Sequence, residues 1–183
     1  MRGFATSFAI VIVVACEPAA APSPAASASG SASPATDDLG AMTEYMRKSK
    51  AAEAKVNLAG IARGVQSARD AESFAPDGTV VPFVLNAAPL TPADGPCCKQ
   101  PKGRCPGGSD QWQHPSWKAI GFELSESHDY AYELVVDPSG FIAKAHGDLD
   151  CDGERSTYEL RGTLRPDGGY EIAAAPTSTA PLE

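Results

Sequence analysis

The first long pattern along the chain is a series of apolar positions with the spacing of one helix face. The steps are mostly three and four, and no proline occurs between Leu39 and Ser73, which is typical of an amphipathic helix of about 34 residues and about 51 Å. Asp37 and Asp38 are candidate N-caps. Gly60 and Gly64 weaken the helix, so two shorter helices with a break near Gly60 are the alternative. The apolar positions are Leu39, Met42, Met46, Ala51, Ala54, Leu58, Ile61, Val65 and Ala68. The opposite face carries Arg47, Lys50, Glu53, Lys55, Arg63 and Asp70.

The C-terminal half alternates between apolar and polar positions, which is the period of strands with one buried face. Between the helix and this half, residues 75–120 are irregular and rich in proline and glycine. A sheet with one apolar face packs against a helix. The predicted fold class is therefore α+β, with a long N-terminal helix on a four-stranded antiparallel sheet. The predicted strands are residues 128–136, 141–146, 156–164 and 170–173.

The N-terminus has the pattern of a secreted protein. Arg2 precedes an apolar run from Phe4 to Ala15, which is too short to span a bilayer but suits a signal peptide of residues 1–15. The run ends in Val-Val-Ala followed by Cys16, which resembles the lipobox of bacterial lipoproteins. This resemblance implies cleavage before Cys16 and acylation of its thiol. An ordinary signal peptide with a chance cysteine is the alternative.

The low-complexity segments set the expected domain boundaries. Residues 16–37 are almost entirely alanine, serine and proline and cannot bury enough apolar surface to fold. We expect them to tether a domain of residues 38–173 to a membrane through the lipid anchor. Residues 174–183 are expected to form a flexible tail. The expected location is the cell envelope, on the periplasmic or outer-membrane surface.

Four cysteines besides Cys16 predict two disulfides, because their number is even and the compartment is oxidising. They are Cys97, Cys98, Cys105 and Cys151. Adjacent cysteines fit disulfide geometry badly. We therefore expect one bridge within the loop to Cys105 and one from the loop to Cys151, which would fasten the loop. A Cys₄ zinc site is the alternative.

An acidic stretch predicts a calcium site. The pattern D-x-D-x-D-G-x₅-E is met by Asp148, Asp150, Asp152, Gly153 and Glu159. Ca²⁺ takes six to eight oxygen ligands, which the aspartates and Glu159 would supply with the Glu154 carbonyl and the Ser156 hydroxyl. Arg155 replaces the aliphatic residue of an EF-hand, and Cys151 interrupts the loop. An acidic β-turn is therefore the alternative.

Short motifs in a fixed order resemble the type IV pilin fold over residues 42–164. They are residues 45–50, 53–55, 57–61, 114–117, 121–122, 130–132 and 141–153. The resemblance implies a long helix, a variable loop and a four-stranded sheet. Phe8 stands where pilins have a glutamate, the apolar run stops at Cys16, and the tether replaces the remaining membrane helix. The sequence therefore indicates a pilin-like headpiece on a lipid anchor.

Charge and motifs limit the classes of function that the chain can have. The chain has 15 Lys and Arg against 23 Asp and Glu, a net charge of −8, which argues against nucleic acid as a partner. No catalytic motif or small-molecule substrate is identified, and Trp112 and Trp117 are expected to pack in the core. We expect a non-enzymatic interaction protein associated with type IV pili or type II secretion. The alternatives are a degenerate prepilin processed after Gly3, acting as a minor pilus or pseudopilus subunit, and a calcium-binding module of the envelope.

Overall fold

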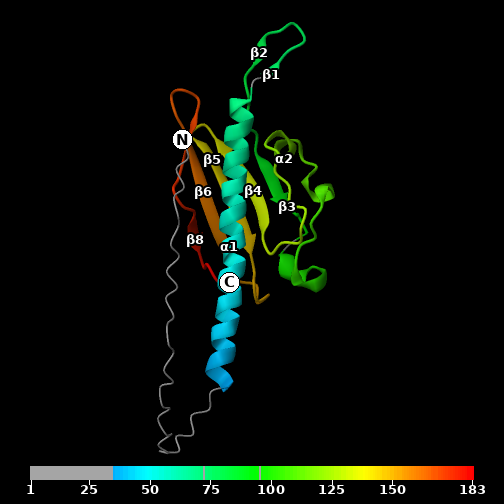
Figure 1. Ribbon diagram of the computed structural model, residues 1–183, viewed down its shortest axis with the longest axis vertical. Coiled ribbons are helices and arrows are strands. Elements are labelled where there is room, and N and C mark those ends of the chain that lie inside the picture. Colours follow the sequence, from blue (N-terminus) through cyan, green and yellow to red (C-terminus); the bar gives the residue numbers. More distant parts are fainter. Residues whose placement is uncertain (1–34, 72, 95) are drawn as a thin grey trace, which may run out of the picture. The chain divides into compact units, whose positions relative to one another are not determined.

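The computed structural model describes residues 35–71, 73–94 and 96–183, and its first element is a single continuous helix, α1, from Ala35 to Asp70 (Figure 1). The predicted long helix is confirmed, and the alternative break near Gly60 is wrong. Asp37 and Asp38 lie inside α1, so neither is its N-cap. The helix begins directly after Pro34, because proline is tolerated at a helix start but not in a helix interior.

The predictions for the N-terminus fall mostly outside the described residues. The signal peptide, Cys16 and residues 17–34 of the predicted tether all lie there. Residues 35–37, which were assigned to the tether, belong to α1 instead. No helix in the part of the chain that the structure describes is long and apolar enough to cross a membrane.

An antiparallel sheet forms the second layer, in the order β3-β4-β5-β6-β7, with β8 paired to β6. The four predicted strands are β4 to β7, and all four are confirmed. In the register, Leu134 faces Ala143 across β4 and β5, and Lys144 faces Glu159 across β5 and β6. The strands are β3 Ala88–Thr91, β4 Ala131–Asp137, β5 Gly140–Gly147, β6 Ser156–Leu164, β7 Tyr170–Ile172 and β8 Thr177–Thr179.

Two strands of this sheet were not expected. β3 lies in the segment predicted to be irregular, and β8 lies in the predicted flexible tail. The tail is instead held to the sheet: the Tyr158 hydroxyl donates a 2.6 Å hydrogen bond to the Pro181 carbonyl, and Leu182 packs against the core. Pairing with β6 supplies hydrogen-bond partners for the backbone of the tail. The low-complexity composition of the tail gives no sign of this pairing.

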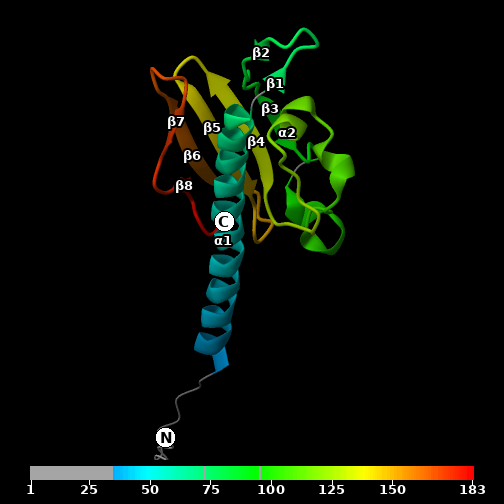
Figure 2. The ribbon, with the colours of Figure 1, turned by 45° about the horizontal axis from the view of Figure 1, so that its top comes forward.

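The core lies between α1 and the sheet face that it covers (Figure 2). From α1 come Ala51, Ala54, Leu58, Ile61 and Val65, all buried. The sheet contributes the inward-facing residues of its alternating strands. These are Tyr132, Leu134, Phe141, Ala143, Ala145, Tyr158 and Leu160.

Much of the connection between α1 and β4 packs beside the sheet as a set of short elements, whereas its first hairpin exposes Phe74, Val80 and Val81. Trp112 and Trp117 are buried there, and the Trp117 indole N–H donates a 2.8 Å hydrogen bond to the Thr91 hydroxyl. Both tryptophans pack in the core, as predicted. The elements are the hairpin of β1 Ser73–Phe74 and β2 Val80–Val81, the short helices η1 Cys97–Lys99, η2 Pro101–Gly103 and η3 Ser109–Trp112, and α2 Pro115–Ala119.

Candidate functional site

Two disulfides fasten the connection to the rest of the domain. Cys97 bonds to Cys105, with 4.5 Å between their Cα atoms, and Cys98 bonds to Cys151, with 5.7 Å. The expectation of one bridge within the loop and one to Cys151 is confirmed. All four cysteines of the described residues are oxidised, so the Cys₄ zinc alternative is wrong. Disulfides of this kind persist outside the cytoplasm, which indicates an extracytoplasmic domain.

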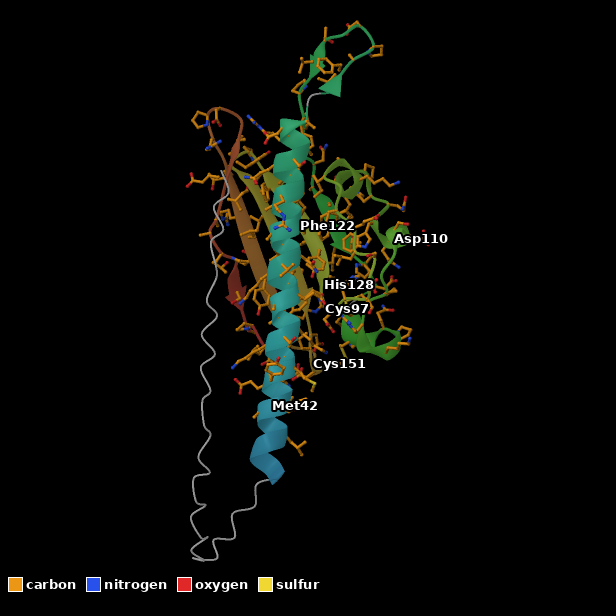
Figure 3. The ribbon with its side chains drawn as sticks, in the orientation of Figure 1. Met42, Cys97, Asp110, Phe122, His128 and Cys151 are labelled. Carbon is orange, nitrogen blue, oxygen red and sulfur yellow. A yellow bond between two sulfur atoms is a disulfide. The ribbon has the colours of Figure 1, made fainter. Side chains whose placement is uncertain are left out.

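The second bridge brings the connection against the loop between β5 and β6, which carries the acidic residues. Carboxylate oxygens of Asp148, Asp150 and Asp152 lie within 4.8 Å of one another. Asp150 and Asp152 are on the exposed side of this loop, whereas Asp148 is only 2% exposed. Cys151 lies beside α1 (Figure 3), so the loop sits close to the helix. We refer to these three aspartates as the acidic loop.

Each aspartate of the acidic loop makes a different contact. The Asp148 Oδ2 atom accepts a 3.3 Å hydrogen bond from the Gly153 amide, and its Oδ1 atom is buried without a hydrogen-bond partner among the described residues. Asp150 Oδ2 lies 2.6 Å from the Arg47 guanidinium of α1. Asp152 Oδ1 accepts a 2.8 Å bond from the Glu154 amide. Several oxygen lone pairs of the acidic loop therefore remain free.

Two of the predicted calcium ligands do not join the acidic loop. Glu159 belongs to β6, faces Lys144 across the sheet, and lies 3.5 Å from the Lys144 ammonium. The strand begins at Ser156, so alternation along β6 takes Glu159 to the outer face of the sheet, away from the loop. The side chain of Glu154, whose carbonyl was the predicted ligand, is exposed and outside the group of converging carboxylates. Of the predicted carboxylate ligands, the three aspartates therefore converge and Glu159 lies apart, and calcium binding itself stays a prediction.

Sequence reasoning missed a partly buried polar network around Glu53, a residue predicted to be on the exposed helix face. Glu53 Oε1 accepts a 2.9 Å hydrogen bond from the Asp129 amide, and Glu53 Oε2 lies 3.0 Å from the Arg104 guanidinium. Arg104 also lies 3.1 Å from an Asp129 carboxylate oxygen, and Lys50 lies 3.4 Å from the other. Burial raises the pKa of Glu53 above its ordinary value, although the Asp129 amide and Arg104 oppose this. No signal in the local sequence distinguishes Glu53 from its exposed helical neighbours.

A hollow of about 280 Å³ opens beside this network, lined by Glu53, Asn57 and residues 123–128. His128 is buried at its wall, and its Nδ1 atom donates a 3.2 Å hydrogen bond to the Glu126 carbonyl. The ring lies next to the Cys97–Cys105 bridge (Figure 3). Burial lowers the pKa of His128, so the ring is kept neutral.

The start of α1 exposes four apolar residues, of which Leu39, Met42 and Met46 were predicted to be part of its core face. Leu39 is 70% exposed, Met42 57%, Tyr45 69% and Met46 47%. Met42 marks this part of the helix in Figure 3. We call these four residues the apolar stripe. They lie on one side of α1, but at about 100° per residue the centre of this side is about 130° away from that of the α1 residues that form the core, and no element of the described chain covers them.

Comparison with protein-family models, curated proteins and solved structures finds no match to this chain. The class is therefore defined by the architecture alone. It is an α+β domain in which a long N-terminal helix packs on an antiparallel sheet, which is a pilin-like arrangement, and two disulfides fasten it.

Proposed function

We propose that this chain is a non-enzymatic, lipid-anchored protein of the cell envelope whose pilin-like domain binds a subunit of a type IV pilus or of a type II secretion pseudopilus. The observation that carries the proposal is the division of α1 into a buried part and an exposed part. Leu58 and Ile61 are fully buried against the sheet, whereas the apolar stripe faces solvent.

The apolar stripe is the surface proposed to make the contact. Its four side chains are close together at one end of the helix, and clustered exposed apolar residues mark interaction sites more often than single ones do. An amphipathic helix that presents such residues is suited to pack against another helix or a groove. In the pilin family, N-terminal helices pack together in the filament, which favours a pilin-like subunit as the partner.

The lipid anchor explains why such a helix would not be an ordinary filament helix. The sequence from Cys16 to Pro34 resembles a lipidated tether, and Pro18, Pro22, Pro24 and Pro34 oppose a helix that continues through it. The second candidate function is a degenerate prepilin that is processed after Gly3. It needs a processing enzyme that accepts Phe8 in place of the usual glutamate.

Mass spectrometry of the N-terminal peptide from native membranes separates these two candidates. A diacyl or triacyl mass on Cys16 supports the tethered protein. A free or methylated N-terminus at Phe4 supports the prepilin and would overturn the lipid-anchored proposal.

Site-specific photo-cross-linking in cells tests the partner. A cross-linker at Met42 is expected to capture a pilus or pseudopilus subunit, which is identified by mass spectrometry. The matched control is Val56, which is 64% exposed on the same helix but lies outside the apolar stripe. Equal capture of the same subunit from both positions, or capture of no such subunit from Met42, would contradict the proposal.

A further inference from the structure

We infer that a pocket beside η2 binds an acidic peptide segment of a partner protein, with Lys102 paired to a carboxylate of the peptide and one apolar side chain of the peptide inside the pocket. This inference concerns a different surface from the apolar stripe and does not depend on the proposed partner of that stripe. It rests on the lining of the pocket, on a local excess of positive charge and on the bonds that hold the pocket in shape.

The pocket lies between η2 and the segment that precedes β4, and its volume is about 450 Å³. This volume falls in the range of roughly 300–1,000 Å³ that is usual for ligand sites. The lining is mainly apolar, but the described residues that form it include no leucine, isoleucine or valine. Such a short apolar surface suits one side chain of a ligand rather than a lipid chain. The lining residues are Gln100, Pro101, Lys102, Arg104, Pro106 and Ser127.

Positive charge gathers around this pocket. Residues 96–109 contain three cations and no acidic residue, although the net charge of the whole chain is −8. Arg104 is already paired with two carboxylates of the network around Glu53. Lys99 and Lys102 are exposed and form no ion pair within the described chain. The rim of the pocket therefore carries positive charge that a carboxylate of a partner would neutralise.

Covalent and backbone bonds hold the pocket in shape. The Cys97–Cys105 bridge closes the ring of chain that carries η2, so this wall is restrained. The backbones of Cys105 and His128 exchange hydrogen bonds of 2.8 and 3.0 Å, which fix the neighbouring Pro106 and Ser127 relative to each other. A preformed pocket loses less conformational freedom when a ligand binds, which favours binding.

Lys102 has an unusual backbone conformation at the rim of the pocket. Its φ is 66°, in the left-handed region that residues other than glycine seldom adopt. Gly103 follows with a φ of 68°, so the chain turns tightly at this point. Backbone strain of this kind is concentrated at functional sites. Here it falls on the cation that we assign to the carboxylate of the ligand.

The ligand has to offer a carboxylate and an apolar group close together. An extended acidic peptide does so, because its side chains alternate and acidic segments are recognised by clusters of cations. A nucleic acid also carries anions, but the net charge of −8 opposes the approach of a polyanion. Ion pairs of exposed lysines are weak and are screened by salt, so we expect a transient complex.

The test begins with an array of short peptides in which glutamates flank a central residue and every residue type occurs once at the centre. The intact chain, with its disulfides oxidised, is expected to bind the peptides with leucine, isoleucine, valine or methionine at the centre better than those with serine or glycine. Replacing the glutamates by glutamine should abolish the binding. The strongest peptide is then titrated by fluorescence anisotropy at about 0.05 M and about 0.5 M NaCl, with weaker binding expected at the higher concentration.

Three variants locate the peptide. Lys102→Glu is expected to weaken binding by about fivefold or more, because an attractive charge becomes repulsive. Ser127→Trp fills the pocket without a change of charge and should remove the preference for an apolar central residue. Lys118→Glu is the matched control and is expected to bind like the wild type, since Lys118 is an exposed lysine of the same connection that does not line the pocket.

Equal losses in Lys102→Glu and Lys118→Glu would overturn the proposal, because the peptide would then be attracted by net charge alone. Equal binding of peptides with apolar and with serine centres would also overturn it, since no side chain would then enter the pocket. The proposal fails too if no arrayed peptide binds, or if the chain binds vesicles of phosphatidylglycerol and none of the peptides. If Ser127→Trp does not fold, the comparison of the two lysine variants still decides.

Discussion

Arg47 of α1 and Asp150 of the acidic loop form an ion pair with 2.6 Å between Nη2 and Oδ2, although 103 positions separate them in the chain. The pair joins the part of α1 that carries the apolar stripe to the loop between β5 and β6. The two side chains are 31% and 28% exposed, so the ion pair contributes little to global stability. It can still hold the start of α1 against the loop.

The first prediction concerns this ion pair. Arg47→Ala is expected to lower the free energy of unfolding by only about 0.2–1 kcal/mol, because partly exposed ion pairs are weak. Amide hydrogen exchange in the first turns of α1 is expected to become faster, since the helix start loses its attachment to the loop. Lys48→Ala is the control, because Lys48 pairs with Glu44 within the same helix and not with the loop. Equal acceleration in both variants would show that Arg47 does not hold the helix start.

The second prediction compares two glycines of α1. A Cβ atom at Gly64 would clash with the Ile120 carbonyl oxygen, whereas a Cβ atom at Gly60 would meet Phe122 at an ordinary 3.6 Å. Gly64→Ala is therefore expected to destabilise the protein by about 1–3 kcal/mol through overpacking. Gly60→Ala should be neutral or stabilise it by up to about 1 kcal/mol, because alanine favours the helix. Urea denaturation of both variants measures the difference, and a Gly64→Ala protein as stable as the wild type would contradict the close contact.

Much of the architecture was predictable because regular periods dominate α1 and β4 to β6. The helical spacing of Leu58, Ile61 and Val65 and the alternation of Tyr132 and Leu134 each identify an element without reference to the rest of the chain. β3 and β8 could not be predicted in this way. They are short, and they become strands only because β4 and β6 offer free edges for pairing.

The predictions for the candidate sites succeeded where they depended on local spacing and failed where the tertiary structure decides. The acidic loop brings its aspartates together, as alternate positions in a tight loop predict. Glu159 lies apart from these aspartates because β6 has already begun at Ser156. Leu39 and Met42 fit the three- and four-residue steps used to predict the core face, but they are 70% and 57% exposed because the apolar stripe is turned away from the buried face of α1. Glu53 is partly covered by Arg104 and Asp129, which are 51 and 76 positions away.

The third prediction concerns the two disulfides. The Cys98–Cys151 bridge closes a loop of 53 positions and the Cys97–Cys105 bridge one of 8. The chain-entropy relation then gives stabilisations of about 4 and about 2.5 kcal/mol, because a longer loop loses more freedom in the unfolded state. Cys98→Ser with Cys151→Ser and Cys97→Ala with Cys105→Ala are compared by urea denaturation. A larger loss in the second pair would contradict the loop-length argument.

The fourth prediction concerns the network around Glu53. Glu53→Ala removes the acceptor of the Asp129 amide and one carboxylate from Arg104, and it is expected to cost about 1–3 kcal/mol of unfolding free energy. Glu53→Gln keeps an oxygen for the Asp129 amide and removes a charge whose burial is unfavourable, so its loss should be smaller. The exposed Glu44→Ala variant is the control. An equal loss in Glu53→Ala and Glu53→Gln would show that the charge, rather than the hydrogen bond, stabilises the network.

The last prediction concerns pH and His128. Burial lowers the pKa of His128 below its ordinary 6.5, so the folded protein keeps the ring neutral where the unfolded chain takes up a proton. The contribution of His128 to stability is therefore fully present above about pH 7 and is lost as the pH falls through 6.5 toward the lowered pKa. Urea denaturation between about pH 7.5 and 5 is expected to show a steeper loss of stability in the wild type than in His128→Gln.

The control for this experiment is His114→Gln, at an exposed histidine in the same connection. Comparing each variant with the wild type cancels the effects of the other titrating groups on stability. Glu53 is one of these groups, and its raised pKa gives the opposite pH dependence: its contribution to stability is present at low pH and is lost as the pH rises through the raised pKa. Parallel stability curves for the wild type and His128→Gln would show that the folded protein accepts a proton on His128 as readily as the unfolded chain does. The His128 ring would then be accessible to water, which would contradict its buried position in the wall of the hollow beside Glu53.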